Sequence, residues 1–513
     1  MRTILEYLEK SKKRDENKIA VIDEHGKCTY KELMENSKKI GSEIAKKIET
    51  KRPVPVLMEK GINALNSFLG AVYANCFYVL LNPDLPQTRL EHIIEVLEPE
   101  IIITDEKNQE LAKTIFKKEI LLVEDLKNSE IDEELLANIR ENILDIDPLY
   151  ANFTSGSTGI PKGVVVSNHS VMDFIDNFTE IFNITEKDVI GNQAPFDFDV
   201  SVKDIYSALK TGATLVIIPK KYFSLPTELL DFICENKVTT MIWAVSALCL
   251  ITTFHGLDYK TPETVNKVLF SGEVMPLKHL KQWIEHLPNA MFVNLYGPTE
   301  ITCNCTYYIV DNNKQYEKTL PMGKPFPNEE VFLLDDQNKK IVEKGINGEI
   351  CVRGVALALG YYNSREQTDS RFVQNPLNTK YNDYIYRTGD LAYYNENGEM
   401  CFAGRKDFQI KFMGHRIELE EIERAMEKVP QIDRSCCIFN EQKGRLYGFY
   451  VGNIEKAQVL EELRKDLPVF MIPNSIKQIE KFPMTKNGKI DRKELMEMIG
   501  GKKKWKMKIL QKL

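Results

Sequence analysis

Short apolar runs alternate with longer amphipathic segments over roughly the first 405 residues of the chain. The runs are rich in β-branched and aromatic residues and have the length of strands. They lie at residues 54–59, 77–82, 101–105, 212–219, 238–244, 267–272 and 290–297. Between them, residues 64–74 and 228–235 show helical periodicity. Strands separated by helix-length segments predict parallel βαβ units, with helices covering both faces of the sheets.

The pattern changes in the last third of the chain. From about residue 338, the strand 349–354 and a Gly-punctuated stretch that ends near Phe402 predict a small antiparallel, β-barrel-like region. After Arg405 a compact α+β unit is expected, with strands and helices at 408–414, 418–428, 435–440, 444–452 and 455–466. We therefore predict an α/β protein with a large lobe at 1–405, a small mobile lobe at 406–500 and a basic tail at 501–513.

Composition is that of a globular protein with a large core. The 513 residues are 43% hydrophobic and 28% charged, which excludes disordered and collagen-like chains. The longest apolar stretch, residues 68–81, is only about 14 residues long and contains Asn75, so it is too short to cross a bilayer. Residues 1–18 alternate charged and apolar positions without a cleavage site, as an ordinary surface helix does. We expect a cytoplasmic protein with no integral membrane segment.

The ten cysteines are too sparse for a disulfide framework. The closest pairs, Cys303/Cys305 and Cys436/Cys437, lack the intervening loop of a zinc knuckle, so we expect reduced thiols. A net charge of -7 argues against nucleic-acid binding. Residues 406–513 carry 23 Lys and Arg against 16 Asp and Glu. This basic lobe suits an acidic partner, although a solvated face explains the charge equally well.

The segment 154–163, TSGSTGIPKG, is the first candidate for chemistry. Small and hydroxyl residues leave backbone N–H groups open to phosphate oxygens, and Lys162 adds a point charge. The segment is not a Walker loop, because Lys162 follows Pro161 and no Ser or Thr comes after it. Taken alone, such a loop is also typical of a mobile connector.

Four further segments accompany this loop in order along the chain. They are NLYGPTE at 294–300, YRTGD at 386–390, GRKDFQIKFMGHRIELEEIE at 404–423 and NGKIDR at 487–492. With them the chain resembles the adenylate-forming superfamily, specifically the amino-acid adenylation domains of nonribosomal peptide synthetases and the stand-alone D-alanine:carrier-protein ligases. The resemblance runs from Cys28 to Arg492. It implies a two-step ligase that uses ATP and Mg²⁺ to form an aminoacyl-adenylate and then loads the phosphopantetheine thiol of a carrier protein.

The resemblance assigns the nucleotide site residue by residue. The phosphate-binding loop would comprise Thr154, Ser155, Gly156, Ser157, Thr158, Gly159 and Lys162. Glu300 is similar to the magnesium ligand, with a solvated acid at a helix start as the alternative reading. Asp390 would accept the ribose hydroxyls, unless Gly389-Asp390 is a plain turn. The remaining nucleotide contacts would be Gly272, Glu273, Tyr296 against adenine, Gly297, Thr299 beside the α-phosphate and Arg405.

Three positions of the small lobe have implied roles in catalysis. Lys489 follows Asn487-Gly488, a hairpin signal that presents it at a loop tip. In the family this lysine bridges the substrate carboxylate and the α-phosphate, where charge develops in the transition state. Lys411, with Gly414 after it, matches the strand that replaces Lys489 in the second step. Asp407 matches the hinge about which the small lobe rotates.

Asp199 aligns with the aspartate that pairs with the α-ammonium of an amino-acid substrate. Its alternative reading is a helix N-cap. The other implied pocket positions are Val200, Lys203, Ser246, Leu269, Ser271, Leu295, Cys303 and Asn304. Val200, Leu269, Ser271 and Leu295 agree with serine-activating domains, and Cys303 and Asn304 are near substitutions, whereas D-alanine ligases usually carry cysteine where Ser271 stands. Lys203 and Ser246 depart from the serine pattern; Lys203 could bind an acidic side chain or pair with Asp199 along a helix.

We therefore expect activation of a small amino acid, serine-like before D-alanine-like. No carrier segment follows Arg492, so we expect either a separate carrier protein as acceptor or a chain that is an excised piece. We also expect a monomer. Two alternatives stay open: an acyl- or aryl-CoA ligase with the same ATP site, and a non-catalytic nucleotide-binding module.

Overall fold

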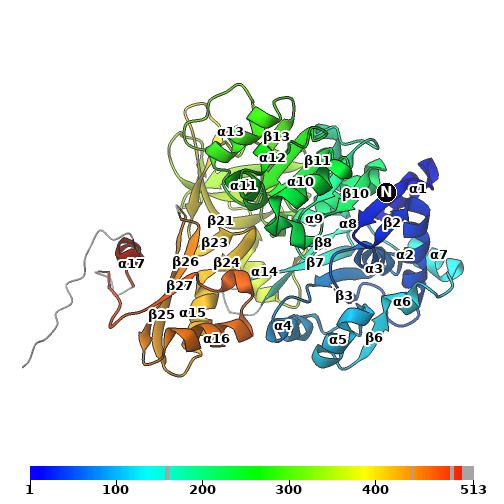
Figure 1. The fold of residues 1–513 in the computed structure, drawn as a ribbon, viewed down its shortest axis with the longest axis horizontal. Helices are drawn as coiled ribbons and strands as arrows, with labels where there is room; N and C mark the ends of the chain where they lie inside the picture. Colours follow the sequence, from blue (N-terminus) through cyan, green and yellow to red (C-terminus); the bar gives the residue numbers. More distant parts are fainter. Residues whose placement is uncertain (156–160, 442, 486–489, 500–513) are drawn as a thin grey trace, which may run out of the picture. The chain divides into compact units, whose positions relative to one another are not determined.

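The computed structural model describes residues 1–155, 161–441, 443–485 and 490–499. The chain divides into two compact units, a large one up to Asp407 and a smaller one from Phe408. Leu85–Arg89 group with the smaller unit, as do Ser155 and Pro161. The sequence placed this division two residues earlier, after Arg405. Figure 1 shows the strands and helices of both units.

A nine-stranded sheet forms one layer of the large unit. Its strand order is β15 (Lys324–Pro325), β14 (Thr306–Ile309), β13 (Met291–Tyr296), β12 (Lys267–Ser271), β11 (Thr240–Ala244), β9 (Val189–Asn192), β10 (Thr214–Ile217), β1 (Ile19–Asp23) and β2 (Gly26–Thr29). Every pairing from β13 to β1 is parallel, and antiparallel strands close both edges. The parallel βαβ units predicted from residues 212–297 are therefore confirmed.

A seven-stranded sheet forms the second layer. Its order is β19 (Gly360–Tyr361), β8 (Lys162–Ser167), β7 (Pro148–Thr154), β4 (Phe77–Leu81), β3 (Pro53–Leu57), β5 (Ile101–Thr104) and β6 (Glu119–Leu122). The pairings from β7 to β6 are parallel, whereas β8 and β19 are antiparallel additions. β3 and β4 are buried along their whole length, which explains their continuous apolar sequence.

Fourteen helices of the large unit flank these sheets. They are α1 (Leu5–Arg14), α2 (Tyr30–Ala45), α3 (Ile62–Tyr73), α4 (Gln87–Leu97), α5 (Gln109–Ile115), α6 (Val123–Leu126), α7 (Glu133–Glu141), α8 (Asn168–Ile181), α9 (Val200–Thr211), α10 (Pro226–Glu235), α11 (Val245–Thr253), α12 (Gly256–Tyr259), α13 (Leu277–His286) and α14 (Arg365–Arg371), counted over the described residues. α3 is buried from Ala64 to Tyr73, so the longest apolar stretch of the sequence is core. One continuous core holds residues of both sheets, including Val56 and Ile190.

A third, antiparallel sheet completes the large unit. It contains β17 (Lys340–Ile341), β16 (Glu329–Leu334), β18 (Gly348–Gly354), β21 (Tyr384–Tyr394) and β20 (Phe372–Gln374), with β22 (Met400–Arg405) also paired to β21. The antiparallel region predicted near residue 338 thus begins at Glu329. Within the described residues, the first and last strands of this path, β17 and β20, do not pair with each other, so the sheet does not close into a barrel.

The smaller unit is the predicted α+β lobe. It contains β23 (Gln409–Phe412), β24 (His415–Glu418), α15 (Leu419–Glu427), β25 (Ile432–Asn440), β26 (Arg445–Gly452), α16 (Lys456–Asp466), β27 (Ser475–Gln478) and α17 (Arg492–Ile499). Its core includes Ile422, Met426 and Leu463. An ion pair between Arg492 Nη1 and Glu423 Oε1, 2.7 Å long, links α17 to α15.

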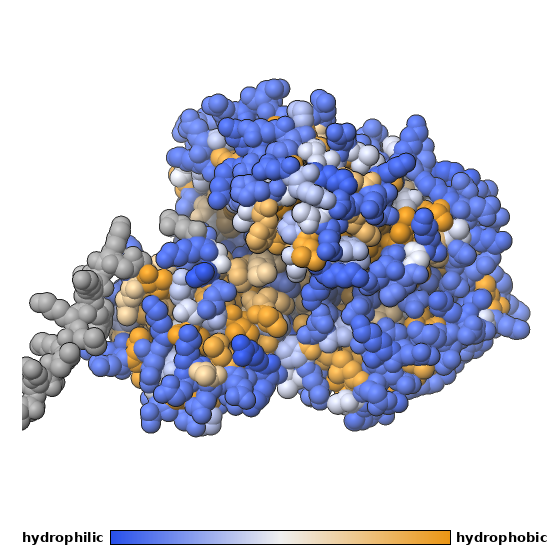
Figure 2. Space-filling view, viewed as in Figure 1, coloured by the Kyte–Doolittle hydropathy of each residue, from blue (hydrophilic) through white to orange (hydrophobic). Residues whose placement is uncertain are grey.

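Hydrophilic residues cover most of the face drawn in Figure 2. Within the described ranges, no helix combines the length and apolar character needed to cross a bilayer. All ten cysteines are free, and eight of them are buried, which agrees with reduced thiols.

Candidate active site

Asp390 and Arg405 face each other on neighbouring strands. They are register partners of β21 and β22, and Arg405 Nη1 lies 2.5 Å from Asp390 Oδ1. Tyr296, at the end of β13, donates its phenol proton to Asp390 Oδ2 at 2.6 Å. Burial, and next the nearby Asp390 carboxylate, hold the pKa of Tyr296 well above its usual range. The fold thus brings Tyr296 into contact with Asp390, which lies 94 residues later in the sequence, and Asp390 into contact with Arg405.

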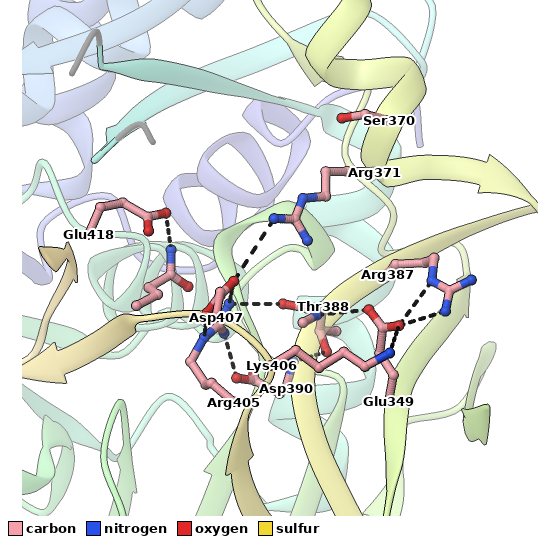
Figure 3. Close-up of polar contacts among 12 residues, drawn as sticks. Glu349, Ser370, Arg371, Arg387, Thr388, Asp390, Arg405, Lys406, Asp407 and Glu418 are labelled. Atoms are coloured by element: carbon pink, nitrogen blue, oxygen red, sulfur yellow. Dashed lines mark hydrogen bonds and ion pairs between the residues drawn. The ribbon is translucent and has the colours of Figure 1, made fainter. Parts of the chain in front are cut away.

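The same arginine also binds Asp407. Arg405 Nε and Nη2 donate to Asp407 Oδ1 and Oδ2 at 2.6 and 2.8 Å, a bidentate pair that Figure 3 shows beside Thr388 and Asp390. Gly389 has a φ of 74°, and a Cβ there would lie 2.9 Å from Arg405 Nη2. Gly389-Asp390 is therefore not a plain surface turn, because Asp390 lies within a strand and is only 1% exposed.

A second group surrounds the segment after β13. Gly297 is required there, because a Cβ would lie 2.4 Å from Asn304 Cα. Glu300 is only 1% exposed and accepts a hydrogen bond from the Tyr361 phenol at 2.8 Å, so the alternative of a solvated acid is wrong. Thr302 and Cys303 adopt left-handed φ values of 50° and 73°, a strained backbone that clusters at functional sites.

The described part of the predicted phosphate loop lies at the junction of β7 and β8. Thr154 pairs with Lys162 across the two strands, and the Lys162 ammonium lies 5.5 Å from the centre of the Tyr361 ring. Ser155 is buried. Four predicted loop residues, Gly156, Ser157, Thr158 and Gly159, lie outside the residues that the structure describes.

The predicted amino-acid pocket contains a buried lysine. Lys203 Nζ donates to Asn304 Oδ1 at 2.6 Å and to Ser271 Oγ at 3.3 Å. Burial lowers the pKa of Lys203. The Cys303 thiol donates to the Asp199 carbonyl oxygen at 3.1 Å, and burial raises the pKa of that thiol. The fold thus brings together residues from β12, α9 and the loop after β13.

Asp199 occupies the N-cap position of α9, but its side chain makes no capping hydrogen bond. The N-cap reading of this residue therefore lacks the bond that defines it. Leu269 and Leu295 are buried in β12 and β13, as expected of positions that restrict a pocket. Val200 and Ser246 lie in the first turns of α9 and α11.

The half-buried Lys60 and the buried Asn192 and Asp204 were not identified from the sequence. Lys60 Nζ donates to Asn192 Oδ1 at 3.0 Å, and Asn192 Nδ2 donates to Asp204 Oδ2 at 2.7 Å. Burial lowers the pKa of Lys60 to about 7 and raises that of Asp204 to about 7. Little in the sequence indicated them. Asn192 is a polar residue at the end of an apolar strand, and Asp204 is an acid directly after Lys203. Tyr361, the partner of Glu300, was missed as well.

The remaining predicted residues lie in segments next to these groups, in the smaller unit or outside the described ranges. Gly272, with a φ of 96°, and Glu273 follow β12, and Thr299 opens the short helical turn that contains Glu300. Lys411 lies in β23 of the smaller unit opposite Arg416, with Gly414 at a φ of 80° after it. Lys489 lies outside the described residues.

The donor set of the large unit fits a magnesium nucleotide. Among the residues described, no three His, Cys, Asp or Glu side chains gather into a metal cage. A single buried carboxylate, Glu300, suits Mg²⁺, which keeps several waters and takes its other ligands from substrate phosphates. The close backbone approach at Gly297 leaves no room for a side chain beside Asn304. Glu300 would hold the metal, and Asp390 would hold a ribose.

Comparison with known proteins identifies the family of this chain. The sequence profile of the AMP-binding enzyme family matches residues 8–362, more than half of the chain. The chain belongs to the AMP-binding enzyme family. Surfactin synthase subunit 1 of Bacillus subtilis (strain 168) is 32% identical to this AMP-binding enzyme over 507 residues, which cover 96% of the chain but only 14% of that relative. Zwittermicin A synthase ZmaJ of Bacillus cereus is 32% identical over 496 residues, covering 94% of the chain and 92% of ZmaJ.

The fold of this AMP-binding enzyme is also shared by a solved adenylation domain. The Vibrio cholerae adenylation domain AlmE, in complex with glycyl-adenosine-5'-phosphate, has a TM-score of 0.85 over 97% of each chain at 22% identity. These matches confirm the resemblance to the adenylate-forming superfamily. The chain spans less than a fifth of two of its curated relatives. A closer kinship with D-alanine:carrier-protein ligases stays a prediction.

Proposed function

We propose that this AMP-binding enzyme activates a small polar amino acid as its adenylate and then transfers the acyl group to the phosphopantetheine thiol of a separate carrier protein. The observation that carries the proposal is the position of Asp199. It stands at the start of α9 and makes no helix-capping hydrogen bond, one turn before the buried Lys203, which donates to Ser271 and Asn304. A carboxylate at this place gives a substrate ammonium a charged partner, worth roughly 4 kcal/mol at 4 Å before desolvation.

The polarity and burial of the predicted pocket residues support the proposed substrate. An ammonium has three N–H donors, and two of those on Lys203 are directed at Asn304 and Ser271. A substrate side chain with a small oxygen acceptor would engage the third donor. The buried Leu269 and Leu295 favour a short side chain. Serine fits both requirements better than D-alanine, and a short acidic side chain is the next choice.

The residues of the large unit would divide the first step between them. Asp199 binds the ammonium, which turns the substrate carboxylate toward the nucleotide. Asp390 accepts the ribose hydroxyls, and Arg405 fixes the Asp390 carboxylate from the other side. The substrate carboxylate oxygen attacks the α-phosphorus, and the bond to pyrophosphate breaks. Glu300 would hold Mg²⁺, which would supply positive charge to the phosphates, and Lys162 would add to that charge.

Lys489 and Lys411 would act from the smaller unit in turn. Lys489 is proposed to bridge the carboxylate and the α-phosphate during adenylation, and Lys411 to serve the thioester-forming step. In that step the carrier thiol attacks the acyl carbon and AMP leaves. Asp407 is the proposed hinge. The excess of basic residues in 406–513 supports docking of an acidic carrier protein. A cytoplasmic location stays a prediction.

The test is amino-acid-dependent ATP/pyrophosphate exchange with all L- and D-amino acids. We expect L-serine or a similarly small polar amino acid to give the highest rate. Asp199→Asn should raise the KM of the amino acid by about 100-fold, as expected for a lost buried charge pair. Lys489→Ala should lower the exchange rate by about 100-fold or more, whereas the exposed Lys481→Ala should match wild type.

Other outcomes would select a different function. Exchange stimulated only by fatty or aromatic acids would establish an acyl- or aryl-CoA ligase and contradict the role of Asp199. Nucleotide binding without exchange by any acid would establish a non-catalytic module.

A further inference from the structure

Tyr361 lies between two groups that the proposed ATP site needs. Its phenol donates to Glu300 Oε1 at 2.8 Å, and its ring faces the Lys162 ammonium, 5.5 Å from the ring centre. Glu300 is the proposed magnesium ligand, and Lys162 ends the phosphate loop. One side chain therefore contacts the negative and the positive member of the site at the same time.

The backbone of Tyr361 is fixed independently of these contacts. Tyr361 pairs with Val164 where β19 joins β8, and its N–H donates to Thr368 Oγ1 at 2.9 Å. Its ring also packs edge-on against Phe372, with centroids 5.9 Å apart. The side chain is 7% exposed, so it has little freedom to take another rotamer.

The segment that carries Tyr361 also holds the Glu300 loop through the main chain. The N–H of Ala358 donates to the Glu300 carbonyl oxygen at 2.9 Å, and Thr302 Oγ1 donates to the Ala356 carbonyl at 2.7 Å. Leu359 and Tyr362 donate their N–H groups to β8 carbonyls, those of Val165 and Gly163. Residues 356–362 thus connect the strand of Lys162 with the loop of Glu300.

We propose that Tyr361 is a positioning residue that sets the affinity for magnesium-bound ATP, by orienting the Glu300 carboxylate with its phenol and the Lys162 ammonium with its ring. The proposal rests on the proposed function, because it takes Glu300 and Lys162 as parts of an ATP site. Mg²⁺ demands near-ideal octahedral geometry, so a carboxylate fixed by a charge-assisted hydrogen bond binds it better than a rotating one. The cation–π contact restrains the position of the lysine ammonium.

The two contacts can be separated by substitution. Tyr361→Phe keeps the ring beside Lys162 and removes only the hydrogen bond to Glu300. Tyr361→Leu removes both contacts. The neighbouring Tyr362, whose ring packs 5.5 Å from that of Phe77, supplies the matched control Tyr362→Phe. None of these variants alters a residue proposed to contact substrate.

The experiment measures ATP binding by calorimetry in excess EDTA and again in excess Mg²⁺, together with the thermal midpoint of each unliganded variant. For Tyr361→Phe we expect Kd to rise five- to tenfold in Mg²⁺ and to stay within twofold of wild type in EDTA. Tyr361→Leu should weaken ATP in both conditions, by fivefold or more in EDTA. Tyr362→Phe should match wild type in both.

Specific results would overturn the inference. The inference fails if Tyr361→Phe binds ATP with the wild-type Kd in Mg²⁺. It also fails if the variant raises the Kd for ATP by the same factor in EDTA as in Mg²⁺. Either result would show that Tyr361 only contributes to packing, even if the thermal midpoint of the variant is lowered. Should Tyr361→Leu fail to fold, Tyr361→Phe alone decides the magnesium part, and Lys162→Met, which should weaken ATP in EDTA by fivefold or more, decides the lysine part. If the wild-type protein binds no ATP in either condition, the proposed function itself is wrong. That result differs from one in which wild type binds ATP and only the Tyr361 variants depart from the expected Kd values.

Discussion

Lys203 Nζ lies 2.6 Å from Asn304 Oδ1, inside the large unit and with the lysine fully buried. The two residues are 101 positions apart in sequence. A buried ammonium is costly unless its donors are matched by acceptors. Asn304 and Ser271 provide two, so the lysine is held in one place by neutral oxygen atoms.

We predict that Lys203→Met changes the choice of amino acid more than the overall rate. Met has a similar length but no donor, so exchange with serine should fall by about tenfold or more while exchange with alanine changes by less than about threefold. The measurement is kcat/KM for both amino acids in pyrophosphate exchange. Lys210→Met, on the same helix and paired with Asp176 near the surface, is the control. An equal loss for both amino acids would show that Lys203 only supports the fold.

Asp407→Ala is predicted to separate the two steps of the reaction. Arg405 is shared between Asp390 and Asp407, so the variant leaves its contact with Asp390 while removing the charge at the proposed hinge. Exchange should stay within about threefold of wild type, and carrier loading should fall by about tenfold, because the populations of the lobe orientations change. Both rates are measured on the same preparations.

The control for this variant is Asp336→Ala. Asp336 accepts from Lys406 at 2.8 Å, one residue before the hinge, and its side chain is 89% exposed. It should leave both steps unchanged. Parallel loss of exchange and loading in Asp407→Ala would assign Asp407 to the nucleotide site instead of the hinge.

Glu329 gives the enzyme a predicted pH dependence of stability. Burial, and less strongly the Asp173 carboxylate, raise the pKa of Glu329 from 4.5 to about 8, although its Oε1 accepts from the Ala356 N–H at 2.8 Å. The folded state therefore holds a proton that the unfolded state releases above pH 4.5. The bound proton contributes its full share to the free energy of unfolding below pH 4.5. This contribution is lost as the pH rises from 4.5 through 8.

Glu329→Gln removes this titration and keeps a hydrogen-bond acceptor for Ala356. Its free energy of unfolding relative to wild type should rise by up to about 4 kcal/mol between pH 5 and pH 9. Urea denaturation at both pH values measures the difference, and the exposed neighbour Glu330→Gln should show none. A constant difference across this range would mean that Glu329 titrates normally in the folded protein.

Much of the fold was predictable because the relevant patterns are local. The apolar runs that became β11 and β12 are recognisable in a few residues, and helix α16 begins one residue from its predicted start. The small lobe was recognisable for the same reason. The division between the units was placed two residues early, because a boundary depends on which contacts cross it.

The candidate site was predictable only as far as short motifs reach. The motifs around Asp390 and Glu300 marked both residues as candidates, but these motifs did not indicate that the two side chains are buried. Tyr361, Lys60 and Asp204 carried no local signal, since a tyrosine, a lysine and an aspartate in such positions are equally common on surfaces. Their partners come from other strands and helices, such as Asn192 for both Lys60 and Asp204.

The sequence by itself determined the layered α/β class, the small α+β lobe and membership of a nucleotide-binding family, because periodicity and motif spacing are written in consecutive residues. Only the tertiary structure decided which polar side chains share a buried environment. Crossover connections bring β12, β13 and α9 together from distant parts of the chain. Each buried donor then pairs with an acceptor that this packing places within hydrogen-bond distance, as Lys203 does with Asn304 and Tyr361 with Glu300.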